Sequence, residues 1–161
     1  MPNYAVLTGD LVNSRRNKND DFQSMIGGLS EAMQYCEVNY SCRFELYRGD
    51  SFQMMLQEPT DSVVIAILIR IKLKLMSANG IWDARIGVGI GKVEHPATRL
   101  SSSLGEAYIL SGNALDSIGS DRLMIKTNNE EANNCLELLT RFCDNLISTL
   151  SQKRVRSSKQ L

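Results

Sequence analysis

The sequence predicts a single α+β domain whose strands and helices follow the order βαββαβ and then αβα. The first observation is a hairpin at residues 44–56, where apolar residues alternate on both sides of a Gly49-Asp50 turn. The second is the alternation of strand-like runs with longer stretches of helical periodicity. The third is size, because 161 residues that are 43% hydrophobic suffice for one globular core.

Composition narrows the function classes. Lysine plus arginine and aspartate plus glutamate both number 18, so no overall charge points to nucleic acid or a membrane surface. The longest apolar run, residues 63–75, is interrupted by Arg70, Lys72 and Lys74 and is not a bilayer span. The first ten residues carry neither a basic leader nor a signal-like apolar stretch. We therefore expect a soluble, cytoplasmic protein.

The first strand is expected at residues 4–8, where it is followed by Gly9-Asp10 and a polar loop that leads into a helix near Asp20. Apolar side chains then recur at the spacing of one helical face: Phe22, Met25, Ile26, Leu29, Met33 and Cys36. The pair Gly27-Gly28 weakens this helix by roughly 1 kcal/mol per glycine, which indicates a break or a close packing contact there.

The hairpin follows this helix. Phe44 begins the alternation on its incoming strand, and Phe52, Met54 and Leu56 share one face of its outgoing strand. Glycine and aspartate are typical turn residues, so Asp50 is expected at the hairpin tip.

Two later segments each have two interpretations. Residues 61–77 fit both a strand and a helix, and their length favours the helix. In residues 83–93, glycines alternate with Ile86, Val88 and Ile90, which leaves one face of a strand bare. Either a helix packs tightly against that face or a ligand approaches it, and helix packing is the more common reason.

The C-terminal third continues the alternation. Ser103 and Glu106 match a capping box for a helix that runs to about Ile118, and a short strand is expected at residues 122–127. Asn128 with Glu131 begins a last helix. Its apolar stripe indicates packing rather than chemistry and consists of Ala132, Cys135, Leu136, Leu139, Phe142, Cys143, Leu146 and Leu150. We expect the domain to span residues 1–152 and residues 153–161 to form a basic tail.

The cysteines do not indicate a zinc site. Cys36, Cys42, Cys135 and Cys143 include no CxxC pair, and His95 is the single histidine. We predict free thiols that behave as small apolar side chains, and a surface histidine in a loop.

The order of elements brings the two Gly-Asp sequences together. In a split βαβ arrangement the first two strands are parallel and the third lies between them, so the end of the first strand lies beside the hairpin tip. Asp10 and Asp50 would repel each other there unless a cation is bound. A hard divalent cation that shares phosphate oxygens is one explanation, and it implies a nucleotide partner. The other is that each Gly-Asp is only turn chemistry, and periodicity alone does not choose between them.

Four segments extend this interpretation: YAVLTGDLVNSR, YRGDSFQMML, ARIGVGIGKV and GEAYILSGNALDSI. In this order they resemble the superfamily of class III nucleotidyl cyclases and diguanylate cyclase (GGDEF) domains, over about residues 4–127. The set is most similar to the SatD-like proteins of prokaryotes, in which such a domain can precede a helix-turn-helix. The tail at residues 153–161 would suit the entry to that module, so nucleic acid is implied only through a module that this chain lacks.

The resemblance implies a ferredoxin-like palm that holds Mg²⁺ or Mn²⁺ on Asp10 and Asp50, with the Leu11 carbonyl as a further ligand. The groups that it places near a triphosphate are the backbone amides of Val12, Asn13 and Ser14 and the charge of Arg15. In cyclases two domains dimerise, one bringing the metals and the other the groups for base and transition state. A homodimer that takes a nucleoside triphosphate or cyclic nucleotide is therefore implied, and the apolar helix at 61–76 offers surface for it.

Three departures bear on turnover. Ser51 stands where the GGDEF signature has its second acidic residue. Asn113 matches the cyclase asparagine, but Ser117 stands where an arginine would follow, which removes a clamp on the developing phosphate charge. Arg48, beside the hairpin tip, is the visible substitute. We predict a metal-dependent nucleotide-binding, regulatory domain with weak or no turnover. The alternative is an active nucleotidyl cyclase or related phosphoryl-transfer enzyme with two metals on the two aspartates.

Overall fold

The computed structural model describes residues 2–14, 19–78, 80–94 and 99–150. The strands are β1 (Tyr4–Leu11), β2 (Cys42–Tyr47), β3 (Ser51–Leu56), β4 (Ala84–Gly91) and β5 (Leu123–Thr127). The helices are α1 (Asn19–Asn39), α2 (Ser62–Met76), α3 (Glu106–Ser117) and α4 (Glu130–Ser148), with short 3₁₀ turns at Pro59–Asp61 and Leu100–Ser102. The predicted βαββαβ-αβα order and the helical interpretation of residues 61–77 are confirmed. Arg15, His95 and the tail lie outside the described residues.

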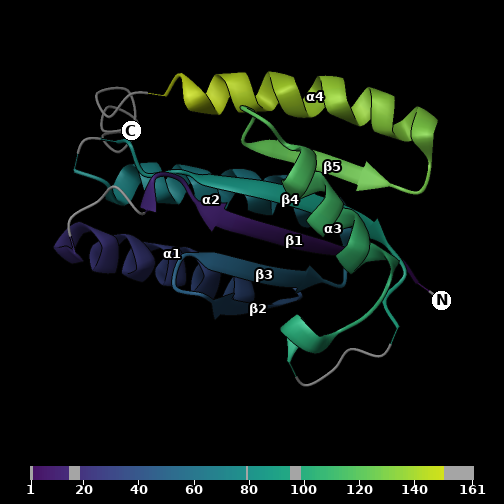
Figure 1. Cartoon of the computed structure of the whole chain (residues 1–161), viewed down its shortest axis with the longest axis horizontal. Coiled ribbons are helices and arrows are strands. Elements are labelled where there is room, and N and C mark those ends of the chain that lie inside the picture. The colour runs from purple at the N-terminus through teal and green to yellow at the C-terminus, as the bar shows by residue number, and fades with distance from the viewer. Residues whose placement is uncertain (1, 15–18, 79, 95–98, 151–161) are drawn as a thin grey trace.

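One five-stranded sheet has the order β2-β3-β1-β4-β5 (Figure 1). β1 is antiparallel to both β3 and β4, β2 is antiparallel to β3, and β4 is parallel to β5. β3 therefore separates two parallel strands, as the split βαβ arrangement predicts, and the fold is a ferredoxin-like α+β palm with an added αβα unit.

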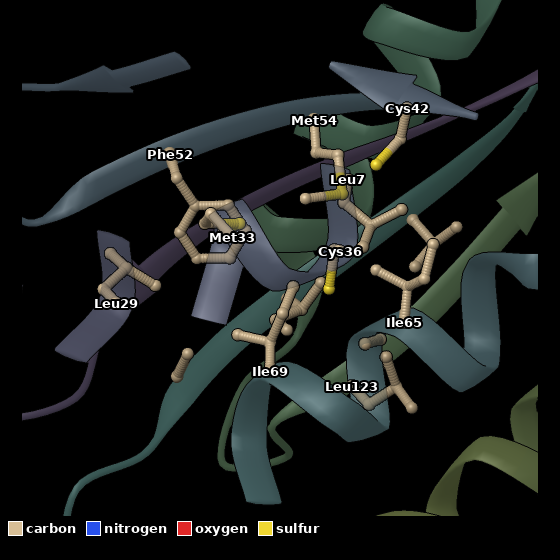
Figure 2. Packing of buried hydrophobic residues seen from close by; sticks show 14 of the residues in the cluster. Leu7, Leu29, Met33, Cys36, Cys42, Phe52, Met54, Ile65, Ile69 and Leu123 are labelled. Carbon is tan, nitrogen blue, oxygen red and sulfur yellow. The ribbon is translucent and has the colours of Figure 1, made fainter. Parts of the chain in front are cut away.

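The main core lies between the sheet and the layer formed by α1 and α2. Leu7, Phe52 and Met54 of the strands contact side chains of α1 and α2, among them Met33 and Ile69 (Figure 2). These residues alternate along their strands with residues that face the opposite side, so the hydrophobic pattern fixes which face of each strand is buried. A smaller apolar cluster on that opposite side includes Val6, Met55, Ala107 and Tyr108.

The bare face of the glycine strand is covered by α3. A Cβ atom added at Gly89 would collide with the Ala107 carbonyl oxygen and the Ser111 amide nitrogen, and one at Gly87 would collide with the backbone of α3 near Leu115. Tight helix packing is thus the reason for these glycines, as the more common interpretation holds. Gly28 of α1 is likewise packed, against Met76 and Trp82.

Two helix starts differ from expectation. Gly105, with φ of 147°, is the N-cap of α3, so the predicted Ser103–Glu106 capping box is wrong. The Glu106 carboxylate instead accepts hydrogen bonds from the Lys92 amide (3.2 Å) and the Asn128 side chain (3.1 Å). Asn129 rather than Asn128 caps α4, because its side-chain oxygen accepts from the Ala132 amide at 2.9 Å.

The apolar stripe of α4 is not the packing face that its sequence indicates. Leu136 does contact the main core, but Leu139, Phe142 and Leu146 are exposed. The residues of α4 that are buried are Thr140, Asp144 and Ile147. The reason is that Asp144 is drawn inward by an ion pair with Arg70 of α2.

Candidate functional site

The end of β1 and the tip of the β2–β3 hairpin are joined by backbone pairing. Asp10 is the register partner of Ser51, and the Leu11 amide donates to the Asp50 carbonyl at 2.9 Å. The hairpin turns through left-handed backbone at Arg48 (φ 52°) and Gly49 (φ 83°), the second of which favours glycine. Local turn chemistry and strand order together therefore place both Gly-Asp sequences at one end of the sheet.

Asp10 is paired with an arginine that the sequence did not single out. Asp10 and Arg85 are register partners on neighbouring strands. Arg85 donates from Nε to Oδ1 at 2.8 Å and from Nη2 to Oδ2 at 2.6 Å, which is a bidentate pair. The hydrogen bond to Asp10 raises the pKa of Arg85 above its ordinary value, against a smaller opposing effect of burial. The Asp10 charge is thus already compensated within the chain.

Asp50 has a different environment. The Ser14 hydroxyl donates to Asp50 Oδ2 at 2.5 Å, and the Ser51 hydroxyl lies 3.4 Å from Oδ1. Asn13 adopts a left-handed conformation (φ 57°), and Ser14 beyond it is buried. In the described part of the chain Asp50 forms no salt bridge, so its carboxylate has neutral donors but no cation of its own.

Both carboxylates line one cavity of about 650 Å³. Its walls are Asp10, Leu11, Val12, Asn13, Ser14, Asp50, Arg85, Gly119, Ser120 and Arg122. The volume falls in the range of about 300–1,000 Å³ that is typical of small-molecule sites. The loop that the resemblance assigns to a triphosphate therefore lines the same cavity as the two aspartates.

Four of these residues were missed by sequence reasoning. Arg85 is the second residue of β4, which otherwise holds small and apolar residues, and its charge in such a strand is the signal that could have identified it. Gly119, Ser120 and Arg122 form the turn between α3 and β5, and no motif marks them. The Val12 amide donates to the Asp83 carbonyl at 2.9 Å, so it is used by the protein rather than free for a phosphate.

A buried ionic network supports two walls of the cavity. The Arg70 side chain, with no exposed surface, donates to both Asp83 oxygens (2.8 and 3.0 Å) and to Asp144 (2.7 Å). Asp144 also accepts from the Arg122 amide at 2.9 Å, and the Asp83 carbonyl holds Val12. Arg70 is thus connected through Asp83 to the wall at Val12 and through Asp144 to the wall at Arg122.

This network sets the pKa values of its members. Burial by itself would raise the pKa of Asp83, but the hydrogen bonds and charge of Arg70, together with Lys74 and the Ala84 amide, hold that pKa below its ordinary value. Burial opposes the charged form of Arg70 as well, yet its two carboxylate partners raise its pKa. Both groups are therefore charged at neutral pH.

Two predicted site residues, Arg48 and Asn113, lie outside the cavity lining. Arg48 is exposed at the hairpin tip. Asn113 is exposed on α3, and its carbonyl accepts from the Ser117 hydroxyl at 2.5 Å. Lys126 of β5 donates to Ser117 Oγ at 2.7 Å and lies 3.4 Å from the Asn113 carbonyl. An ammonium group therefore lies beside Ser117, where the resemblance expects an arginine.

The residues present fit a divalent cation only if water and phosphate supply its remaining ligands. Among the described residues, no group of three or more histidine, cysteine, aspartate or glutamate side chains could hold a metal ion. The cavity offers two carboxylates and a serine hydroxyl, which are oxygen donors of the kind that Mg²⁺ accepts when water and phosphate complete its shell. Each Asp10 oxygen accepts one hydrogen bond from Arg85, so a cation at this carboxylate would compete with the guanidinium for its charge.

Comparison with solved structures identifies the fold. A bacterial light-regulated adenylyl cyclase has a TM-score of 0.60 and 10% identity, over 77% of this chain and 75% of that chain. The adenylyl cyclase CyaB from P. aeruginosa has a TM-score of 0.57 and 13% identity, over 85% and 81%. The guanylate cyclase domain of RhGC from Catenaria anguillulae, in complex with GTP, has a TM-score of 0.56 and 14% identity, over 72% and 73%.

These likenesses establish that the chain has the fold of adenylyl and guanylyl cyclases. No family model matches the chain, and no curated protein matches it. The narrower resemblance to SatD-like proteins, the boundary at residue 152 and the helix-turn-helix stay predictions. In the described ranges no helix has both the length and the apolar character needed to cross a membrane.

Proposed function

We propose that this chain is a nucleotide-binding domain of the nucleotidyl cyclase type, in which Asp10 and Asp50 hold Mg²⁺ or Mn²⁺ that enters with a nucleoside triphosphate. The observation that carries the proposal is the cavity itself, which Asp10, Asp50, Arg85 and Arg122 line together. Turn chemistry alone would explain the two aspartates, but it would not bring Arg85 of β4 and Arg122 of the α3–β5 turn to the same cavity.

The charges of the cavity support an anionic ligand with its cation. Two aspartates and two arginines line it, so the lining is neutral. A bound Mg²⁺ or Mn²⁺ would neutralise phosphate charge and favour deprotonation of a nucleophilic hydroxyl. Asp10, once paired with a cation, would no longer need Arg85, and that guanidinium with Arg122 would then bind phosphate oxygens. The Ser14 hydroxyl orients the Asp50 carboxylate.

Turnover would require a second copy of the chain. Asn113 and Lys126 do not line the cavity of their own chain, so they would act on the cavity of a partner. A homodimer of this kind is the arrangement that the resemblance implies. Because Lys126 is a point charge without the planar fork of arginine, we expect at most weak turnover and a regulatory role. The Lys126–Ser117 contact favours the active cyclase as the second candidate.

Calorimetric titration with Mn²⁺, with and without a nonhydrolysable nucleoside triphosphate, tests the metal site. Asp10→Asn and Asp50→Asn should each abolish Mn²⁺ binding while the circular dichroism spectrum stays unchanged. Asp61→Asn is the matched control, since Asp61 lies near the start of α2 and outside the cavity. Unchanged affinity in both cavity variants would refute the proposal.

Arg85→Gln should change the affinities for Mn²⁺ and for the triphosphate in opposite directions. Removing the guanidinium frees both oxygens of Asp10, so the affinity for Mn²⁺ alone should rise. The affinity for the triphosphate should fall, because one of the two cavity arginines is lost. A variant that weakens both ligands equally would show that Arg85 has only a structural role.

Mass spectrometry after incubation with each nucleoside triphosphate and Mn²⁺ decides between the two candidates. We expect little or no cyclic nucleotide. Robust product that disappears in both Asp50→Asn and Lys126→Met would establish the active cyclase instead.

A further inference from the structure

Helix α4 presents its apolar side to solvent. The exposed fractions are 74% for Leu138, 61% for Leu139, 65% for Phe142 and 54% for Leu146. The opposite side of the helix is buried and carries Thr140 and Asp144 beside Ile147. In a soluble monomer an amphipathic helix turns its apolar stripe inward, so this inverted orientation indicates that the outer side has a partner.

The outer side has the spacing of a helix-pairing surface. Ala132, Cys135, Leu139, Phe142 and Leu146 follow one another at alternating intervals of three and four residues, and we call these five residues the α4 seam. This alternation is the a/d pattern of a coiled coil, in which each side chain fits between four side chains of a facing helix. The pattern is therefore suited to a helix rather than to a strand or a flat surface.

The inner side fixes α4 in place. Asp144 accepts hydrogen bonds from Arg70 of α2 and from the Arg122 amide, and the buried Thr140 hydroxyl donates to the Leu136 carbonyl of its own helix. Figure 1 shows α4 along the β5 margin of the molecule, with no drawn element beyond it. The seam is thus carried on an anchored helix at an edge that a second molecule can reach.

We infer that the α4 seam pairs with the α4 seam of a second copy of this chain. The five seam positions carry no charge, so the partner must offer an uncharged apolar strip of similar length, about 21 Å. The same helix of a second copy meets this requirement, and a two-fold axis makes such a contact self-complementary. If fully covered, the exposed apolar side chains of α4, Leu138 included, would bury roughly 500 Å² per chain, or about 1,000 Å² in total, which is at the lower limit for a biological interface.

This contact is separate from the proposed nucleotide site. Leu136 of α4 contacts the core on the α1 and α2 side of the sheet, whereas Asp10 and Arg85 alternate with core residues and face the α3 side. Pairing through α4 therefore leaves the cavity open. It predicts a dimer that forms without metal or nucleotide.

Sedimentation equilibrium of the full chain, without added ligand, tests the inference. We expect a dimer at about 100 µM, and Phe142→Glu should weaken it about 100-fold or more because the two-fold axis buries the charge twice. Val38→Glu is the control, since Val38 is an exposed apolar residue of α1 (84%) outside the seam. Circular dichroism verifies that the Phe142→Glu variant is folded. Mn²⁺ titration of the same variant reports the cavity separately, so a failed seam prediction can be distinguished from a failed metal-site proposal.

Alkylation of Cys135 gives an independent readout because this residue lies within the seam. In the wild type, the rate of Cys135 alkylation, measured on the tryptic peptide by mass spectrometry, should fall as the protein concentration rises, because the dimer covers Cys135. In Phe142→Glu the rate should not depend on protein concentration. A wild-type chain that stays monomeric would overturn the inference and leave the seam to another protein or to another part of this chain. A dimer that Phe142→Glu does not weaken would place the interface on another face.

Discussion

Arg70→Met is the sharpest test of how the cavity walls are held. The substitution keeps an unbranched stem and most of the volume of the side chain but removes the buried hydrogen bonds to Asp83 and Asp144. Lys74, 3.5 Å from Asp83, then compensates only one of the two carboxylates. Breaking a buried pair by removing one partner costs about 3–5 kcal/mol. At about 2–4 °C per kcal/mol for a chain of this size, the melting temperature should fall by roughly 6–20 °C.

The pH dependence of this loss has a definite sign. In the wild type the pKa of Asp83 is below its ordinary value of 3.8, so its contribution to stability is present above pH 3.8 and is lost as the pH falls through the lowered pKa. In Arg70→Met, burial of Asp83 is opposed only by Lys74 and the Ala84 amide, so the pKa of Asp83 should be higher than in the wild type, and the folded variant should bind the proton more readily than the folded wild type. The stability difference between the two proteins should therefore narrow as the pH is lowered from 7 towards 4.

Urea unfolding monitored by circular dichroism at a series of pH values measures both effects. Arg141→Met is the matched control, because Arg141 also bridges two carboxylates, Asp121 (3.3 Å) and Glu137 (3.1 Å), but is 60% exposed. Arg141→Met should lower the free energy of unfolding by less than about 1 kcal/mol. An Arg70→Met loss as small as that of the control, or a loss that does not change with pH, would refute the reasoning.

Two further predictions concern packing and thiol reactivity. Gly89→Val should lower the free energy of unfolding by roughly 1–3 kcal/mol or more, because α3 leaves no room for a side chain there. Gly112→Ala should raise it by about 0.5–1 kcal/mol, because Gly112 lies within α3 with open space around it. Urea unfolding measures both changes. Burial raises the pKa of Cys36 to about 11 and of Cys42 to about 12, so iodoacetamide at pH 7 should modify the exposed Cys135 and spare both, as peptide mass spectrometry would show.

The order of strands and helices was predictable because each element carries its own pattern. The alternation of Phe52, Met54 and Leu56 predicts both the strand and its buried face, and strand order then brings Asp10 beside the hairpin. Periodicity shows that a helix has an apolar side but not which side the protein covers. For α4 that choice depends on Asp144 meeting Arg70, 74 positions earlier in the chain, and no local pattern reports such a contact.

The candidate site was predictable to a similar degree. Asp10, Asp50 and the loop from Leu11 to Ser14 follow from local motifs and topology, and the structure places them at one cavity. Arg85 and Arg122 are single arginines in or beside strands, and they become visible only when β1, β4 and β5 are side by side. Asn113 was a candidate because it matches the cyclase asparagine, but it lies on the exposed side of α3 and does not line the cavity of its own chain.

The pairing of Asp10 with Arg85 connects these observations. Each carboxylate has its own partner in the folded chain, the Arg85 guanidinium at Asp10 and the Ser14 hydroxyl at Asp50. In the proposed site, a cation that arrives with phosphates would replace the guanidinium at Asp10, and the phosphates would give that guanidinium a new anionic partner. Neither ligand offers both halves of this exchange alone. Metal and nucleotide should therefore bind more tightly together than either does separately, and the Asp10–Arg85 pair is the contact through which that cooperativity would act.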